Sequence, residues 1–306
     1  MQALVKYHGL RDWDLRLPYH DSISVNTTCM KTEAQIDDRG IGGVFIGGKL
    51  NSSANERLQA VAWKLKPGAE VSAFRIDSRN VPTNRAKGIG YSSSAGAALT
   101  LLLHDRLVGG GGHPDMRSLS RVARLFAASA ARSLVGGFSR LYAGNDDQST
   151  YAKKFADRRE MDLRTVIVPL PSKIRTEDAH KEVLTSPFFR ARIESAQRRC
   201  DEMEKAILGN DLDTLGVLAE RDTLELHSLT MTGENRLIIM TEDTLRILSM
   251  VRELRGGGVK AYYSMQTGPS VFINTSERFE TKVLKATQKL GYRAYTSSVG
   301  GEATIL

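Results

Sequence analysis

The segment from Val5 to Val25 constrains the fold of this chain more than any other stretch. It carries one lysine, two arginines, three aspartates and two histidines between short apolar steps. Its last residues, Ser22–Val25, alternate polar and apolar side chains, a pattern that is typical of a β-strand. Charged side chains are excluded from a buried strand unless they face a ligand or a partner group. The segment therefore predicts charged groups that lead into a scaffold strand and form a site for an anionic small molecule.

The composition limits the class of protein. With 306 residues, 41% of them hydrophobic and 25% charged, we expect a soluble globular chain of one large or two medium domains. The chain contains no run of about 18 apolar residues, so we expect no membrane span. It also shows no basic-then-apolar leader, so we do not expect secretion. Cys29 and Cys200 lie far apart and lack metal-ligand spacing, which favours a reducing, cytoplasmic location.

The formal net charge of +8 raises the question of nucleic-acid binding. The basic residues are spread along the chain and mixed with acids, and no nucleic-acid motif is present. A phosphorylated metabolite explains the same charge with fewer assumptions. We therefore expect no nucleic-acid partner.

The order of the predicted elements indicates an α+β chain in two parts. Strands are predicted at 22–25, 43–46, 70–76, 136–142, 165–169, 260–265 and 270–274, with a strand-like piece at the end of the chain. Helices are predicted at 92–103, 116–133, 185–209, 212–228, 241–254 and 277–290, and a turn at 109–114. We place the domains at 1–168 and 169–306.

A loop rich in glycine and serine forms the second notable segment, at 80–98. It contains Gly88 and Gly90, followed by Ser92, Ser93 and Ser94 at the start of a predicted helix. Glycines let backbone N–H groups approach an anion, and the helix N-terminus adds positive potential. The same residues also suit a serine-capped, alanine-packed helix, so this loop alone leaves both interpretations open.

Taken together, the two segments resemble the mevalonate-pathway decarboxylases of the GHMP kinase superfamily. The family's Lys-Tyr-Trp-Gly-Lys-Arg-Asp motif is similar to residues 6–12 here, and its nucleotide loop to Asn80–Gly96. Its Ser-Ala-Cys-Arg-Ser-Leu-Gly-Gly-Phe block resembles Ser129–Phe138, and Thr185–Phe189 with Arg192-Ile193 also match. The resemblance covers nearly the whole chain, and the archaeal-type phosphomevalonate decarboxylases look most similar.

This resemblance implies a two-domain GHMP kinase fold. Its parts are an N-terminal ribosomal-protein-S5-like α/β domain and a C-terminal ferredoxin-like α+β domain, with the site in the cleft between them. It also implies ATP and Mg²⁺ as cofactors, a phosphorylated mevalonate as substrate, and a homodimer. The family phosphorylates the tertiary 3-hydroxyl of this substrate and then eliminates phosphate and CO₂, which yields an isopentenyl product.

The resemblance also assigns site residues. Lys6 corresponds to the catalytic lysine, and Arg132 to the arginine that holds the substrate carboxylate, for which paired guanidinium donors are well suited. Tyr7 and Ser129 would contact the substrate, Tyr7 at its 5-phosphate. ATP phosphates would lie against the loop residues Gly88, Gly90, Ser92, Ser93 and Ser94, with Ser93 also facing Mg²⁺. His8 and His20 have no metal partner at useful spacing and are interpreted as structural.

Three departures from the family pattern bear on the reaction. The second lysine of the family is Leu10 here, and a Ser-Gly-Ser becomes Ala127-Ala128-Ser129, which predicts a 5-monophosphate substrate. The nucleotide loop is about three residues longer, with added positive charge at 84–87. The aspartate that should oppose the 3-hydroxyl is Gln266, whose amide cannot accept a proton near neutral pH.

Four functions remain open on these residues. They are an ATP-dependent 5-phosphomevalonate decarboxylase, an ATP-independent mevalonate 3,5-bisphosphate decarboxylase, a mevalonate 3-kinase without decarboxylation, and a non-catalytic metabolite-binding homologue. Only five residues precede Lys6, where the family carries about a dozen or more with an opening strand. We therefore expect either a lost first strand or a misplaced start.

Overall fold

The computed structural model describes residues 1–82, 86–109 and 114–306. Most of the predicted turn at 109–114, and residues 84 and 85 of the loop insertion, lie outside the described residues. Within the described part of the chain, no helix is long and apolar enough to cross a membrane.

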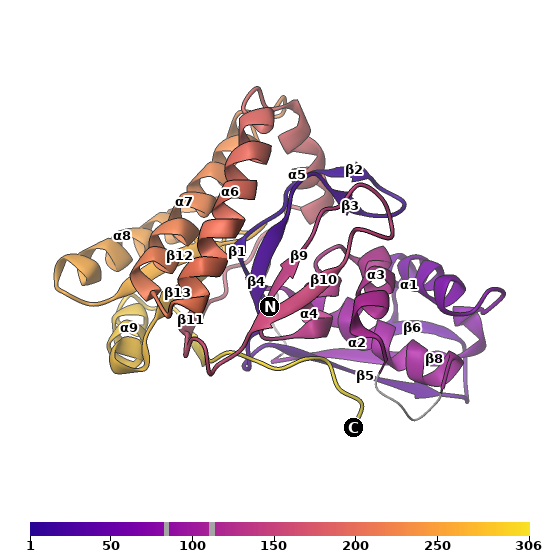
Figure 1. Cartoon of the computed structure of the whole chain (residues 1–306). Coiled ribbons are helices and arrows are strands. Elements are labelled where there is room, and N and C mark those ends of the chain that lie inside the picture. The colour runs from indigo at the N-terminus through magenta and orange to yellow at the C-terminus, as the bar shows by residue number, and fades with distance from the viewer. Residues whose placement is uncertain (83–85, 110–113) are drawn as a thin grey trace.

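The first half of the chain builds two sheets and a hairpin (Figure 1). The first sheet is antiparallel, in the order β1 (Gln2–Val5), β4 (Ser22–Val25), β9 (Phe138–Leu141), β10 (Ala152–Ala156). The second runs in the order β5 (Lys31–Asp37), β8 (Arg75–Val81), β6 (Gly43–Ile46), β7 (Lys49–Leu50). The hairpin joins β2 (Leu10–Asp12) to β3 (Leu17–Pro18). A strand does precede Lys6, so the expectation of a lost first strand is wrong.

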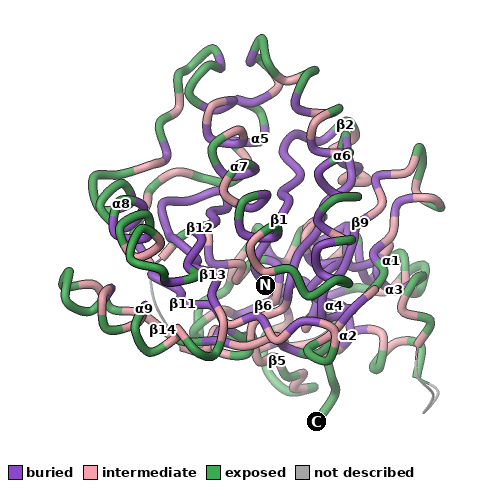
Figure 2. Tube along the Cα trace, turned by 60° about the vertical axis from the view of Figure 1, so that its left-hand side comes forward, coloured by how far each residue is buried: buried purple, intermediate pink, exposed green. Residues whose placement is uncertain are grey.

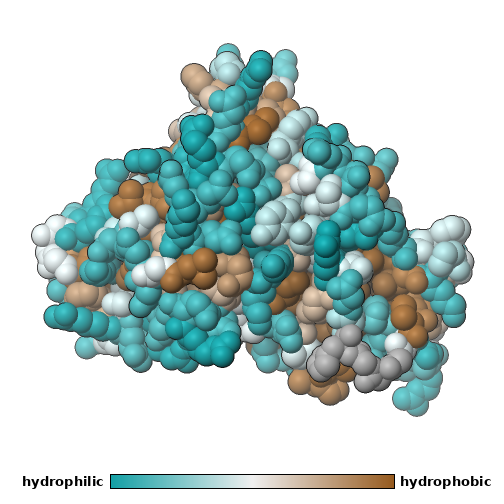
Figure 3. Space-filling view, viewed as in Figure 1, coloured by the Kyte–Doolittle hydropathy of each residue, from teal (hydrophilic) through white to brown (hydrophobic). Residues whose placement is uncertain are grey.

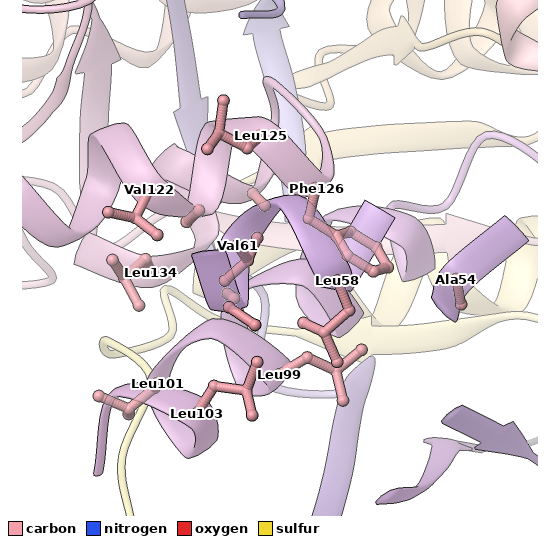
Figure 4. Packing of buried hydrophobic residues seen from close by; sticks show 14 of the residues in the cluster. Ala54, Leu58, Val61, Leu99, Leu101, Leu103, Val122, Leu125, Phe126 and Leu134 are labelled. Atoms are coloured by element: carbon pink, nitrogen blue, oxygen red, sulfur yellow. The ribbon is translucent and has the colours of Figure 1, made fainter. Parts of the chain in front are cut away.

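Helices pack between the two sheets of the first half, two of them against the second sheet and two against the first. They are α1 (Ser52–Leu65), α2 (Tyr91–Leu107), α3 (Met116–Phe126) and the short α4 (Ala130–Val135). Figure 4 shows Leu58, Leu99 and Phe126 from three of these helices meeting in one buried cluster. The inward residues of β6 and β8, such as Val44 and Ile76, complete this core.

The second half contains one antiparallel sheet and five α-helices within the described residues. The sheet runs in the order β12 (Ala261–Met265), β13 (Val271–Thr275), β11 (Arg164–Val168), β14 (Tyr295–Ser297). The helices are α5 (Thr176–Glu182), α6 (Phe189–Leu208), α7 (Leu212–Met231), α8 (Glu242–Gly256) and α9 (Glu277–Lys289), with a 3₁₀ turn at Val183–Thr185. The helices α8 and α9 pack on the face that carries Val166, Tyr263 and Ile273.

The helical hairpin of α6 and α7 ties the two halves together. Its buried residues, among them Cys200 and Leu215, share a core with Leu4 and Ile23 of the first sheet, and Figure 2 shows β1 and β9 buried in the middle of the molecule. The buried Gln2 also donates from Nε2 to Ser264 Oγ and to Asn274 Oδ1 of the third sheet, both at 2.7 Å.

The pairing of β11 bears on the domain boundary. Because β11 pairs with β13 and β14, we propose a boundary within residues 157–163, between β10 and β11, rather than after residue 168.

Three predicted elements differ from the observed ones. The predicted helix at 116–133 is two helices, since the backbone becomes extended at Ala127 and places Ser129 between α3 and α4. The predicted strand at 70–76 begins with a 3₁₀ turn and becomes a strand only at Arg75. The helix predicted from residue 185 starts at Phe189, because Pro187 disfavours helical backbone in the residue before it.

The close packing of α7 on β12 predicts the effect of a single methyl group. A Cβ on Gly216 would lie 2.0 Å from Cγ of Tyr262, so Gly216→Ala should lower the free energy of unfolding by about 1–3 kcal/mol. Urea unfolding followed by circular dichroism measures this change. The matched control is Gly256→Ala in α8, where an added Cβ meets nothing within 4 Å. Equal stabilities of the two variants would contradict the packing.

Candidate active site

The main cavity opens between the helices of the first half and the segment that follows β12. Its volume is about 670 Å³. Three basic side chains line it, Lys6, Arg57 and Lys87, and no carboxylate does so among the described lining residues. The remaining lining includes Asn51, Ser78, Ser92, Ser93, Phe126, Ser129, Thr176 and Gln266. A cavity with this charge suits an anionic ligand.

The glycine-rich loop leads into α2 at the wall of this cavity. Gly90 caps α2 in the left-handed region, with φ of 86°, and a Cβ there would lie 2.4 Å from the carbonyl oxygen of Met1. Only glycine fits so close an approach. The N-terminus of the 17-residue helix α2 therefore faces the cavity, which Gly88, Gly90 and Ser92 line, and this geometry suits phosphate groups.

The hydroxyl groups of the other two serines, Ser93 and Ser94, bond to neighbouring parts of the chain. Ser93 donates from Oγ to the carbonyl of Ser129 at 2.8 Å and lies 2.6 Å from Oγ of Ser133, so it joins α2 to α4. Ser94 bonds to Thr32 Oγ1 of β5 at 2.7 Å and does not line the cavity. No group of three or more histidine, cysteine or acidic side chains among the described residues could hold a metal. The described residues could thus hold ATP phosphates, whereas a Mg²⁺ ion would need phosphate oxygens as its ligands.

Lys6, Tyr7 and Arg132 come together as the resemblance implies. Lys6 Nζ lies 4.0 Å from the centre of the Tyr7 ring, and the Arg132 guanidinium carbon lies 5.4 Å from it. Arg132 is fully buried, and none of its three guanidinium nitrogens has a hydrogen-bond partner among the described residues. Burial lowers the pKa of Arg132 to about 10. An unpaired buried cation is costly, and a carboxylate would match its paired donors. Neither Arg132 nor Tyr7 is among the residues that line the cavity in this structure, whereas Lys6 and Ser129 are.

Two side chains, one from α6 and one from α7, bond to the backbone of Lys6, and a third supports them. Asp222 Oδ2 accepts the Lys6 N–H at 2.9 Å, and Arg192 Nη2 donates to the Lys6 carbonyl at 2.8 Å. Asp222 also pairs with Arg192 at 2.7 Å and with Arg199 at 3.0 Å. We call these three residues the Asp222 cluster. Burial first, and then repulsion by Arg132, lowers the pKa of Lys6 to about 7.

Gln266 acts as a hydrogen-bond donor within the chain. Its Nε2 donates to the carbonyl of Met1 at 3.1 Å and to the carbonyl of Gly88 at 3.3 Å. It therefore holds the glycine-rich loop against the first strand. An amide in this role does not replace the proton acceptor that the family aspartate would supply.

The two replaced phosphate contacts lie in one place. Leu10 and Ala128 are both buried in the same apolar cluster as Tyr7, together with Ala131 and Val135. A second cation would be costly inside this cluster. Both positions are therefore buried and apolar beside Tyr7.

Several residues of the site were not predicted from the sequence. Arg57 of α1 lines the cavity and pairs with Glu177 of α5, yet it reads as an ordinary solvent-facing arginine of an amphipathic helix. Asp222 and His180 sit within helical segments without a motif. His8 and His20, interpreted from the sequence as structural, are both buried, and burial lowers the pKa of His20 to about 3.

Comparisons with known proteins agree over the whole chain. Residues 1–152 match the diphosphomevalonate decarboxylase-like N-terminal domain, and residues 174–299 match the mevalonate 5-diphosphate decarboxylase C-terminal domain. The phosphomevalonate decarboxylase of Haloferax volcanii is 36% identical, covering 100% of this chain and 95% of the relative. The mevalonate 3,5-bisphosphate decarboxylase of Thermoplasma acidophilum is 26% identical, covering 91% of this chain and 69% of the relative.

The fold is confirmed by a solved structure, MDDEF in complex with MVAPP, AMPPCP and magnesium. It superposes with a TM-score of 0.86 at 22% identity, covering 98% of this chain and 94% of that chain. The expected two-domain α+β GHMP fold is therefore correct.

The buried position of Lys6 predicts a pH dependence of stability. Its folded pKa of about 7 lies below the ordinary 10.5, so the folded state holds fewer protons than the unfolded state between these values. Rising pH therefore stabilises the wild type across this window, by at most about 1.4 kcal/mol per pH unit. Lys6→Met removes the burial penalty, so the variant should be more stable than the wild type at pH 7. This stability advantage should shrink as pH rises from 7 to 10.5.

Urea unfolding at several pH values measures this difference. The exposed Lys282→Met on α9 is the matched control. A Lys6→Met advantage that does not change with pH would show that the Lys6 amine is not buried.

Proposed function

Because the chain belongs to the diphosphomevalonate decarboxylase-like family, we propose that it decarboxylates 5-phosphomevalonate to isopentenyl phosphate with the use of ATP. The observation that carries this proposal is the buried guanidinium of Arg132, which lies beside Lys6 and Tyr7 and has no hydrogen-bond partner in the described part of the chain. A substrate with both a carboxylate and a phosphate supplies an acceptor for each part of this cationic group.

The preference for one phosphate at the 5-position rests on Leu10 and Ala128. Both lie in the apolar cluster beside Tyr7, so neither position supplies a cation to a second phosphate. The phosphomevalonate decarboxylase relative, 36% identical over its length, supports the same substrate.

The arrangement suits an elimination. As the bond between the carboxylate carbon and C2 breaks, its electron pair forms the C2–C3 double bond, and the 3-phosphate leaves with the electrons of the C3–O bond. Arg132 would hold the carboxylate, and the Lys6 ammonium would stabilise the charge on the departing phosphate. ATP, bound by its phosphates at the N-terminus of α2, would supply that 3-phosphate.

A second candidate is an ATP-independent mevalonate 3,5-bisphosphate decarboxylase. It is favoured by Gln266, whose amide donates to Met1 and Gly88, and by the absence of carboxylates among the described residues that line the cavity. A substrate that already carries the 3-phosphate needs no group to activate its 3-hydroxyl. The chain's cytoplasmic location and its assembly as a homodimer remain predictions.

One assay separates these functions. The purified protein is incubated with 5-phosphomevalonate or with mevalonate 3,5-bisphosphate, each with and without ATP and Mg²⁺, and CO₂ and ADP are measured. We expect CO₂ and ADP in equal amounts from 5-phosphomevalonate and ATP, and a lower rate with 5-diphosphomevalonate.

The other outcomes each contradict the proposal in a specific way. CO₂ from the bisphosphate alone, with none from 5-phosphomevalonate and ATP, identifies the second candidate. ADP without CO₂ identifies a 3-kinase, and neither product identifies a non-catalytic binding protein.

A further inference from the structure

His180 of α5 lies against the substrate residues but belongs to no motif of the sequence. Its ring stacks on Tyr7 with 5.3 Å between centroids and an angle of 11° between planes. Its Nδ1 accepts the backbone N–H of Gly9 at 3.0 Å. In a neutral imidazole, one nitrogen accepts while the other carries the proton. The Gly9 contact therefore fixes the tautomer in which Nε2 is the donor.

The environment keeps this ring neutral. Burial, and then the charges of Lys6 and Arg16, hold the pKa of His180 well below its ordinary value. Charged or titratable groups around the ring come from three parts of the chain: Lys6, Tyr7 and His8 after β1, Arg16 of the hairpin, and Glu177 of the same helix, which attracts Arg16. The donor is thus available over the physiological pH range.

The Nε2 atom of His180 has no hydrogen-bond partner among the described residues. Unlike both ring nitrogens of His8, it is not sealed from solvent. It shares the cation-rich space of Lys6 and Arg16, and Gly9, which orients it, directly precedes Leu10. An N–H donor is therefore held beside the Tyr7 ring, in the part of the chain next to Leu10.

We infer that His180 donates its Nε2–H to the 5-phosphate of the substrate and so selects the phosphorylated over the unphosphorylated form of mevalonate. This inference rests on the proposed function. A neutral donor supplies one directed hydrogen bond without the added charge of a lysine, which fits a phosphate group rather than a diphosphate.

Two amide variants separate this role from a structural one. In His180→Gln the amide nitrogen reaches the position of Nε2, whereas in His180→Asn the amide oxygen reaches only that of Nδ1 and can still accept from Gly9. Dissociation constants for 5-phosphomevalonate and for mevalonate are measured by titration calorimetry. His104→Gln, half-buried in α2, is the control.

We expect His180→Asn to weaken 5-phosphomevalonate binding by about 10- to 100-fold, the range for a hydrogen bond to a charged group. Its affinity for mevalonate should not change. His180→Gln should retain most of the preference for the phosphorylated form, while its melting temperature falls because Gly9 loses its acceptor.

Two outcomes would overturn the inference alone. Either His180→Asn keeps the wild-type preference for 5-phosphomevalonate, or it weakens both ligands equally. If the wild type binds neither 5-phosphomevalonate nor the 3,5-bisphosphate, the proposed function fails and this inference fails with it.

Discussion

The contact between Asp222 and the backbone of Lys6 is the interaction on which the site depends. Asp222 and Arg192 hold the N–H and the carbonyl of Lys6, and both come from the helical hairpin of the second half. A buried carboxylate is stable only with partners, and here two arginines and a peptide N–H supply them. The same cluster joins α6, α7 and the first strand, so the folding of the two halves and the placement of the amine are coupled.

This arrangement gathers more positive charge than the interior can balance. Arg132 has no hydrogen-bond partner among the described residues, and burial and repulsion lower the pKa of Lys6. Both costs are relieved when an anion enters, because its charge favours the protonated amine and its oxygens accept from the guanidinium. The face of the molecule seen in Figure 3 is mostly hydrophilic, with scattered hydrophobic residues.

The sequence predicted most elements and the residues that carry a motif. Ser22–Val25 and Gly43–Ile46 are strands with the expected bounds, because alternation and turn residues act locally. The break of the helix at Ala127 was not predicted, since it depends on packing that puts Ala128 beside Tyr7. Lys6, Tyr7 and Arg132 were found by resemblance, whereas Asp222 and His180 act through contacts about 170 to 216 residues away in the chain. No local pattern records such contacts, and the donor role of Gln266 toward Met1 and Gly88 is hidden for the same reason.

The most direct test of this account is a crystal structure of the protein with 5-phosphomevalonate. The account predicts that the substrate carboxylate pairs with the Arg132 guanidinium through two hydrogen bonds, with the phosphate beside Tyr7 and His180. A bound substrate whose carboxylate does not reach the guanidinium of Arg132 would contradict it.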